Sequence, residues 1–413
     1  MIEGISPQFL TSLDDLAAQP PKHLLLLYSG GLDGTYLLRQ LRDLGTTVTA
    51  LNVRIGDADP VDQARQHAEL FGAQFRDVDA TEAFFAEFVP AAIHADAVYQ
   101  ELFPVGSTLT RPLMARSAVA VALELGCDVI GHTATYMQNS AIRLSGSIAA
   151  LAPDIGIAAP YLGSDLPRAE KLAALEHAGV AFPEGIHSID ANPWGRVIEN
   201  GTLESPENRL DETVFRWTRG VADAPDAPAE IALTFAGGLP VALDGADVGL
   251  SGLVATLNAL GGEHAVGRSS GLEDTPFGVK NHEIREAPAA TVIIKAHQVL
   301  ANAVLTRHEH SVRAGIAREW TGAVVHGGWF GTLGDSLARC LADLDRPLNG
   351  TVRLRLHKGT LTALSVTSPN GLYYTRLGDG FHASMQGYSY TPWLSLATLP
   401  DRDREQARRF GAV

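Results

Sequence analysis

Residues 24–33 read Leu-Leu-Leu-Leu-Tyr-Ser-Gly-Gly-Leu-Asp, and this stretch decides the fold. A short, continuously apolar run that breaks into Ser-Gly-Gly is typical of a buried parallel strand at its C-terminal end. From residue 32 to residue 44 apolar residues recur at helical spacing, and the pattern stops at Gly45, which is a helix C-cap signal. The stretch therefore predicts a strand, a glycine turn and a helix.

The alternation of strand and helix continues along the chain. Further strands are predicted over residues 48–53, 75–78, 128–131 and 155–160. Helices are predicted over residues 61–71 and 111–125, each stopped by a glycine. Such alternation predicts the α/β class, with a doubly wound, mostly parallel sheet whose ligands bind beyond the C-terminal strand ends.

The alternation weakens after about residue 186. Strand-like segments then cover residues 230–235, 241–243, 352–357 and 361–366, and helices are predicted at 250–260 and 289–305. This mixture predicts an α+β second domain. Residues 1–21 are interpreted as a polar N-terminal arm, and residues 399–410 as a short C-terminal helix that docks on another subunit.

The composition is that of an ordinary globular protein. The 413 residues are 46% hydrophobic and 19% charged, with a net charge of −15, and the length favours two domains. The acidic balance speaks against a nucleic-acid or anionic-membrane partner. Cys127 and Cys340 lack metal-ligand spacing and are expected to be free thiols in a reducing cytoplasm. Neither a signal peptide nor a membrane-spanning run is recognised, so we expect a cytoplasmic location.

The turn at residues 29–33 has the chemistry of a phosphate-binding loop. Gly30 and Gly31 allow backbone N–H groups to converge on an anion, and the following helix points its positive end at the same place. Ser29 and Thr35 can add hydroxyl donors, and Asp33 can orient Mg²⁺ or a bridging water. The loop is neither a Walker loop nor the dinucleotide fingerprint, because their further Gly, Lys and Ser/Thr residues are missing.

Several long motifs in one order carry a resemblance to a known family. They are the loop at 29–33, PVGSTLTRPLMAR at 104–116, NSAIR at 139–143, SIDANPWGRVIENGTLESP at 188–206, HAVGR at 264–268 and EIREAPAATVIIKAH at 283–297. Through them the chain resembles argininosuccinate synthase over about residues 22–390.

The resemblance implies a domain plan and a reaction. The plan is an N-terminal arm (1–21), a nucleotide-binding ATP pyrophosphatase domain (22–185), a synthetase domain (186–390) and a tail with a possible oligomerisation helix (391–413), assembled as a homotetramer. In the implied reaction ATP adenylates the ureido oxygen of citrulline, pyrophosphate leaves, and the amino group of aspartate displaces AMP.

The resemblance also implies the residues that bind ATP and Mg²⁺. The ATP-binding positions are Leu27, Tyr28, Ser29, Gly30, Gly31, Leu32, Asp33, Gly34, Thr35, Val53 and His132. Asp33 is the expected Mg²⁺ ligand, although it could instead cap the loop. The catalytic residues are expected to be Asp33, Asn139 and Arg111. For His132, a lone histidine at a strand end, a purely structural role is the simpler interpretation.

The expected substrate-binding positions are partly altered. Positions that fit the family pattern are Arg111, Thr135, Asn139, Arg143, Ser188, Glu199 and Glu273. Positions that depart from it are Phe103, Thr108, Val197 and Arg285, where Tyr, Ser, Ser and Tyr are usual, and Ser140, where an Asp is usual. The family run Thr-Gly-Lys-Gly-Asn-Asp-Gln is replaced here by residues 135–141, Thr-Tyr-Met-Gln-Asn-Ser-Ala.

These departures lead to a main hypothesis and two alternatives. The main hypothesis is an AMP- and pyrophosphate-forming C–N ligase that joins an amino-acid-like or carboxylate acceptor to an amine, other than citrulline and aspartate. The first alternative is a genuine, divergent argininosuccinate synthase; the second is a catalytically silent nucleotide-binding homologue. Arg285 could select a carboxylate or simply pair with Glu199 or Glu273, and the two glutamates could clamp a substrate ammonium group.

Overall fold

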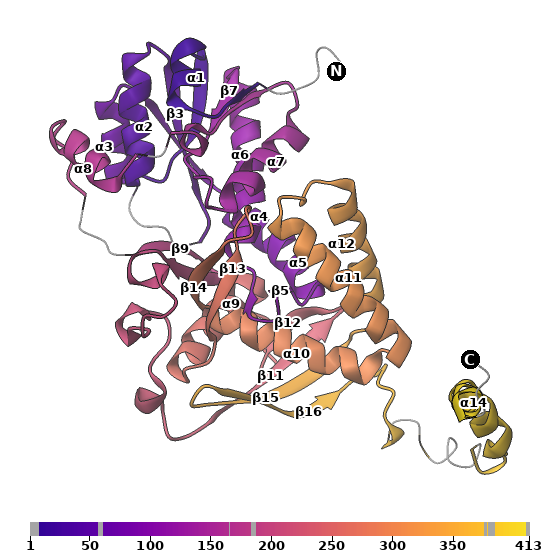
Figure 1. Ribbon diagram of the computed structural model, residues 1–413. Helices are drawn as coiled ribbons and strands as arrows, with labels where there is room; N and C mark the ends of the chain where they lie inside the picture. The colour runs from indigo at the N-terminus through magenta and orange to yellow at the C-terminus, as the bar shows by residue number, and fades with distance from the viewer. Residues whose placement is uncertain are drawn as a thin grey trace. The chain divides into compact units, whose positions relative to one another are not determined.

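A computed structural model describes residues 8–56, 61–164, 166–182, 187–375, 378 and 385–409. The chain falls into two compact units, Met1–Asn370 and Gly371–Val413. The first unit contains the predicted nucleotide-binding domain and the predicted synthetase domain as far as Asn370, and the second contains the C-terminal helix. Figure 1 shows the ribbon coloured by residue number.

The first half of the larger unit is built on a six-stranded sheet. In spatial order its strands are β1 (Phe9–Leu10), β8 (Gly156–Ala158), β7 (Val129–Gly131), β2 (His23–Leu27), β3 (Thr47–Arg54) and β4 (Gln74–Asp79). Every neighbouring pair is parallel, which confirms the predicted sheet.

Helices cover both faces of this sheet because successive side chains of a strand point to opposite faces. Leu24 and Leu26 belong to one apolar cluster, and Leu25 and Leu27 to another. The first cluster includes residues of α2 (Leu32–Asp43), α3 (Asp62–Leu70) and α8 (Arg168–Glu176); the second includes residues of α6 (Ser107–Leu125) and α7 (Ser140–Leu151). Figure 1 shows α2 and α3 on one side and α6 and α7 on the other.

The strand order changes direction at β2. From β2 the chain proceeds to β3 and β4 on one side, whereas β7 and β8 lie on the other. In a doubly wound sheet the crevice at such a reversal is where ligands bind. The turn after β2 and the turn after β7 therefore meet at the ligand-binding edge.

The N-terminal arm is more ordered than we predicted. Residues 9–10 form β1, which pairs with β8, and Leu13–Ala18 form helix α1. A capping box between Ser12 and Asp15 begins the helix, and Leu10 and Leu16 are buried in the core. The prediction of a polar arm was wrong for these residues, because a few apolar side chains suffice to dock a short segment on an open sheet edge.

The second half contains two antiparallel four-stranded sheets. The first has the order β13 (Arg268–Asp274), β14 (Lys280–Glu286), β10 (Gly195–Glu199) and β9 (Ser188–Asn192). The second has the order β12 (Leu239–Leu243), β11 (Ala229–Ala236), β15 (Gly350–His357) and β16 (Thr360–Thr367). The α+β character predicted for this half is confirmed.

Helices of the second half share one large apolar core with the second sheet. They are α9 (Gly249–Glu263), α10 (Pro288–Val304), α11 (Arg307–Val325) and α12 (Thr332–Asp345), joined by α5 (Val89–His94) from the first half. We did not predict α11 and α12. The buried face of α11 includes Arg313 and Thr321, and polar residues on that face interrupt the apolar periodicity.

Short elements connect these parts. They are α4 (Thr81–Ala83), the π-helix η1 (Phe84–Phe88), β5 (Val98–Tyr99), β6 (Phe103–Pro104) and the 3-10 turns η2 (Pro160–Leu162), η3 (Gly201–Glu204), η4 (Glu212–Val214) and η5 (Val221–Asp223). In the second unit, α14 (Tyr390–Arg409) has no buried residue. Among the described residues, no helix is long and apolar enough to cross a membrane.

Candidate active site

The turn after β2 forms a cradle that requires glycine. Gly30 has a φ of +83°, and a Cβ at that position would lie 2.8 Å from the Cβ of Ala64. Ser29 and Gly31 are exposed, and Gly31 is the N-cap of α2. A Cβ on Gly34 would lie 2.7 Å from the ring of Tyr28. The backbone at this turn is therefore open to an anion in front of the positive end of a 12-residue helix.

Thr35 stabilises the turn from inside. Its hydroxyl donates to the carbonyl oxygen of Gly31 at 2.8 Å and lies 2.9 Å from the Tyr28 hydroxyl. Thr35 is fully buried, and burial raises the pKa of Tyr28. In this structure the Thr35 hydroxyl is used within the loop, so the expectation that it is offered to the phosphates stays a prediction. Ser29 remains the exposed hydroxyl.

Lys171 lies beside the loop acid, and sequence reasoning missed it. Its Nζ donates to Oδ1 of Asp33 at 2.8 Å, and the lysine side chain is 6% exposed against 43% for Asp33. Tyr161 adds a hydrogen bond to the Asp33 carbonyl oxygen. No pattern links a lysine on α8 to the loop, so only the tertiary fold brings this cation to the phosphate site.

The remaining predicted ATP-binding residues lie at or next to the C-terminal ends of β2, β3 and β7, or at the start of α2. Leu27 and Leu32 are buried and Val53 is half-buried. His132, at the end of β7, is buried with Nε2 2.9 Å from Ser145 Oγ, and Nδ1 accepts from the Ala134 N–H at 3.3 Å. Burial lowers the pKa of His132 to about 4, so the ring is neutral. Both ring nitrogens are engaged within the protein, which supports the structural interpretation.

One face of the β13–β14–β10–β9 sheet gathers most of the predicted acceptor residues. Glu199 lies opposite Ser188 on one side and Glu283 on the other, and Val197 lies opposite Asp190 and Arg285. Directly opposed residues in an antiparallel pair share a face. The same-face set is Ser188, Asp190, Val197, Glu199, Glu273, Asn281, Glu283 and Arg285. Alternation along 281–283–285 could have indicated Glu283 and Asn281, which we missed.

A buried cluster of opposite charges lies on this face. Arg143 donates from Nη2 to Glu273 at 3.1 Å and from Nε to the Val325 carbonyl oxygen at 2.8 Å. Arg285 pairs with Glu283 and, at 3.5 Å, with Glu273. All four charged side chains are less than 10% exposed. Arg285 therefore does pair with glutamates, as one of our two interpretations expected.

The carboxylates of this cluster differ in their affinity for a proton. Burial raises the pKa of Glu283 to about 8. Burial would also raise the pKa of Glu273, but Arg143 and the other neighbouring groups outweigh it and lower that pKa. Burial raises the pKa of Glu199, whose carboxylate accepts from Asn281 Nδ2 at 3.0 Å. Of the two coupled carboxylates, Glu273 is therefore the stronger acid and Glu283 the weaker one.

The altered turn after β7 closes over this face. Asn139 donates from Nδ2 to the Asp274 carbonyl oxygen at 2.7 Å. The Nε of Arg111 donates to Ser140 Oγ at 3.2 Å, and the same guanidinium forms an ion pair with Asp190. Thr135 is half-buried, and its N–H donates to the Gln138 side chain at 3.1 Å. The cavity between turn and sheet measures ≈ 30 Å³, and it is bounded by Met137, Gln138 and Asn139 of the turn and by Arg143, Glu273 and Glu283 of the charged cluster.

Tyr136 extends from the same turn in another direction. Its ring meets Phe277 edge to face, with centroids 6.0 Å apart. The two rings line a separate apolar cavity of ≈ 360 Å³. The family resemblance leads us to expect Gly-Lys-Gly in this turn. Here the turn instead places bulky side chains at the cavities on both of its sides.

The other predicted acceptor residues lie at the edges. Phe103 is 1% exposed, and Arg285 Cζ lies 3.8 Å from its ring centroid. Thr108 is buried in the first turn of α6, whereas Ser188 is exposed on the edge strand β9. The structure therefore brings Phe103 against the charged cluster, whereas Thr108, Thr135 and Ser188 are not among the residues that line the acceptor cavity.

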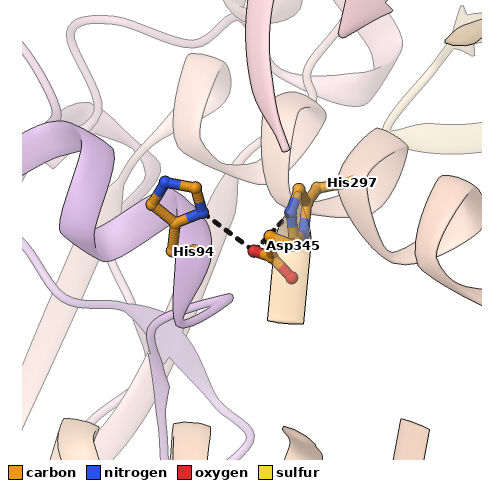
Figure 2. Close-up of side chains that lie close together, drawn as sticks. All are labelled: His94, His297 and Asp345. Atoms are coloured by element: carbon orange, nitrogen blue, oxygen red, sulfur yellow. Dashed lines mark hydrogen bonds and ion pairs between the residues drawn. The ribbon is translucent and has the colours of Figure 1, made fainter. Parts of the chain in front are cut away.

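A further cluster has the ligand types of a metal site. His94, His297 and Asp345 offer ligand atoms within 4.8 Å of one another (Figure 2). Arg313 Nε already donates to Asp345 Oδ1 at 2.7 Å, and Nη1 donates to Asp96 at 2.7 Å. Because a guanidinium occupies the cationic position, the group is an ion-pair network that ties α5, α10, α11 and α12 together. We did not predict it.

The fold and site together define an ATP-dependent synthetase built on a HUP-type nucleotide-binding domain, which forms a C–N bond with release of AMP and pyrophosphate. The chain belongs to the argininosuccinate synthase family. Residues 23–181 match the family described as arginosuccinate synthase N-terminal HUP domain, and residues 187–386 match the arginosuccinate synthase C-terminal domain.

Similar curated proteins bear the name argininosuccinate synthase. The protein from Pyrococcus furiosus is 35% identical over 356 residues, which cover 86% of this chain and 87% of that protein. The one from Synechococcus sp. (strain JA-3-3Ab) is 35% identical over 94% of this chain and 98% of its own length. The one from Gloeobacter violaceus is 36% identical over 94% and 99%.

Proposed function

We propose that the chain catalyses the argininosuccinate synthase reaction, in which ATP activates the ureido oxygen of citrulline and aspartate displaces AMP. The names of the relatives, which align over nearly the whole chain, carry this proposal. They support the genuine synthase, our first alternative, better than the altered-substrate hypothesis. The glycine cradle at Gly30 and Gly31 suits the triphosphate, because the left-handed Gly30 lets the turn pack against Ala64 with its backbone N–H groups exposed, and a Cβ at residue 30 would displace it.

The chain's own residues have distinct tasks in this scheme. Backbone N–H groups of 29–32 would hold the phosphates, and Lys171 would hold Asp33 and add positive charge. Asp33, with 43% of its side chain exposed, is the residue that would bind Mg²⁺, which neutralises charge developing on pyrophosphate. Asn139 and Arg111 would position the acceptor beside the activated phosphate.

A second candidate is favoured by the acceptor pocket itself. Phe103, Val197 and Arg285 offer no hydroxyl group where the resemblance expects tyrosine or serine. A site that loses hydrogen-bond partners for a substrate group discriminates against that substrate by orders of magnitude. This candidate is the same ligase chemistry on another acid–amine pair.

The domain plan and assembly remain part of the proposal. We place the nucleotide-binding domain at 22–185, the synthetase domain at 186–390 and an oligomerisation segment at 391–413. The expected assembly is a homotetramer, located in the cytoplasm, without a nucleic-acid or membrane partner.

A coupled pyrophosphate-release assay separates the candidates. Release with ATP, Mg²⁺, citrulline and aspartate supports the first, and release only with other acid–amine pairs supports the second. ATP binding without release for any pair would indicate the silent homologue. The Asp33→Ala variant should lose pyrophosphate release while retaining the wild-type circular dichroism spectrum, and normal turnover by that variant would remove Asp33 from the scheme.

A further inference from the structure

Arg285 has hydrogen-bonding capacity that the protein does not use. Arg285 is 3% exposed, and its Nε and Nη1 are buried without a hydrogen-bond acceptor. Among the residues that the structure describes, no other arginine has a buried side-chain nitrogen without a hydrogen-bond partner. A buried donor without an acceptor is destabilising, so such a group calls for an explanation, and a missing ligand is one.

The surroundings fix the guanidinium in place. Nη2 alone makes both glutamate contacts, to Glu283 and Glu273, and the plane of the group lies over the Phe103 ring, 3.8 Å from its centroid. Glu273 and Glu283 in turn border the cavity under the 135–141 turn. Val197, which lies opposite Arg285 in the sheet, borders the same cavity. The guanidinium is thus held rigidly directly behind residues that line the acceptor cavity, with little rotational freedom to lose on binding.

The charge balance leaves room for an anion. Two arginines, Arg143 and Arg285, face Glu273, whose pKa is lowered, and Glu283, whose pKa burial raises, so the negative charge of Glu283 is disfavoured at this site. Arg111 is already paired with Asp190. The buried cluster of two arginines and two glutamates should therefore bind a negatively charged substrate group more readily than a neutral hydrogen-bonding one.

We propose that Arg285 is a specificity-determining residue that binds a carboxylate of the acceptor through its free N–H groups. The proposal rests on the proposed function, because it assigns the acceptor to this face of the sheet. Charge-assisted bonds from arginine to a carboxylate are strong and directional, and a carboxamide of the same shape cannot replace them. The acceptor is accordingly a carboxylic acid, recognised as such.

The test compares each acid with its carboxamide. Pyrophosphate release is measured with L-citrulline against L-citrullinamide and with L-glutamate against L-glutamine, each with ATP, Mg²⁺ and an amine. For the acid that supports turnover, we expect the amide to have a kcat/KM lower by roughly 10- to 100-fold. In Arg285→Met the ratio of kcat/KM for acid to kcat/KM for amide should fall to near unity, with the KM for ATP unchanged. In Arg285→Lys the ratio should be partly retained.

The control is Arg355→Met, which removes an exposed arginine paired with Glu230 on β11 and should leave discrimination unchanged. Equal loss for acid and amide in Arg285→Met would indicate a structural role and overturn the proposal, as would equal use of acid and amide by the wild type. If the wild type binds ATP but releases no pyrophosphate with any pair, the proposed function fails. Calorimetric titration of L-glutamate and L-glutamine into wild type and Arg285→Met then decides the role of Arg285 by itself.

Discussion

Gly30 shows how a single residue shapes the nucleotide site. Its backbone is left-handed, with φ at +83°, and the missing side chain leaves space against Ala64 of the neighbouring helix α3. Both features are needed for the N–H groups of the turn to converge on one point. The phosphate binding that we propose for this turn therefore depends on the absence of a side chain at residue 30.

Gly30→Ala should weaken ATP binding by at least tenfold, because the new Cβ would lie 2.8 Å from Ala64 Cβ and displace the turn. Gly45→Ala is the matched control: φ is +71°, but nothing lies within 4 Å of the added Cβ. Both variants should lose about 1–2 kcal/mol of stability from the left-handed backbone. Calorimetric ATP titration and urea unfolding measure the two effects, and equal ATP affinity in both variants would contradict this account of the cradle.

At the scale of elements, the turn between β7 and α7 is the part most altered from the family pattern. It contributes Met137, Gln138 and Asn139 to the acceptor cavity and Tyr136 to the neighbouring apolar cavity. We therefore expect its side chains to affect substrate choice, while the strand and helix that it joins remain regular.

Replacing residues 136–138 by Gly-Lys-Gly together with Ser140→Asp tests that role. If the turn selects the nucleophile, the grafted protein should use aspartate with a kcat/KM at least tenfold above that of the wild type. Pyrophosphate release at varied aspartate concentration measures this. Tyr136→Gly alone, which opens the apolar side without adding charge, is the control. An unchanged aspartate kcat/KM in the graft would assign substrate choice to the sheet face instead.

The ion-pair network of α5, α10, α11 and α12 makes helix packing depend on pH. Burial by itself would lower the pKa of His297, but Asp96 and Asp345 outweigh burial and raise it to about 9. Burial would raise the pKa of Asp345, but hydrogen bonds from His297, His94 and Arg313 hold it well below its usual range. The ion-pair network therefore stabilises the fold most when His297 and Asp345 are both charged.

The unfolded-state pKa of histidine is about 6.5, below the folded value, so the contribution of His297 is complete below that pH and is lost as the pH rises through 9. Asp345 acts in the opposite sense, and its contribution is lost in acid as the carboxyl takes up a proton. We expect the urea midpoint of the wild type to fall between pH 6.5 and 9.

His297→Gln should flatten this decline and cost about 3–5 kcal/mol near pH 6.5, because buried carboxylates lose a charged partner. The control His308→Gln changes an exposed histidine in the first turn of α11. If the urea midpoint of His297→Gln had the same pH dependence as that of the wild type, His297 would not be the titrating group.

At the scale of the whole molecule, the described part of the second unit carries large apolar side chains that the unit itself leaves exposed. In α14, Trp393 and Leu396 are 63% and 71% exposed and lie one turn apart. A helix with such a surface is suited to contact between copies of the chain.

Deleting residues 371–413 should therefore reduce the molar mass of the assembly measured by light scattering, while the first unit keeps its cooperative unfolding. The double change Trp393→Glu with Leu396→Glu should have the same effect without shortening the chain. An unchanged assembly mass in both proteins would exclude α14 from oligomerisation.

Much of this molecule could be predicted locally. The run 24–28 and the glycines after it predicted β2, the turn and α2, because a buried parallel strand and a capped helix each have a local pattern. Helix α11 was missed because Arg313 lies on its buried face, where it pairs with Asp96 and Asp345 from distant segments. No local pattern reveals such a partner.

The sequence by itself determined the parallel sheet, the phosphate cradle and the family, since each depends on short motifs that act through nearby backbone. The tertiary structure alone decided that Lys171 pairs with Asp33 and that Arg285 lies over Phe103 with two nitrogens unpaired. The physical reason is that pairing and burial depend on distances across the fold, which residue order does not contain.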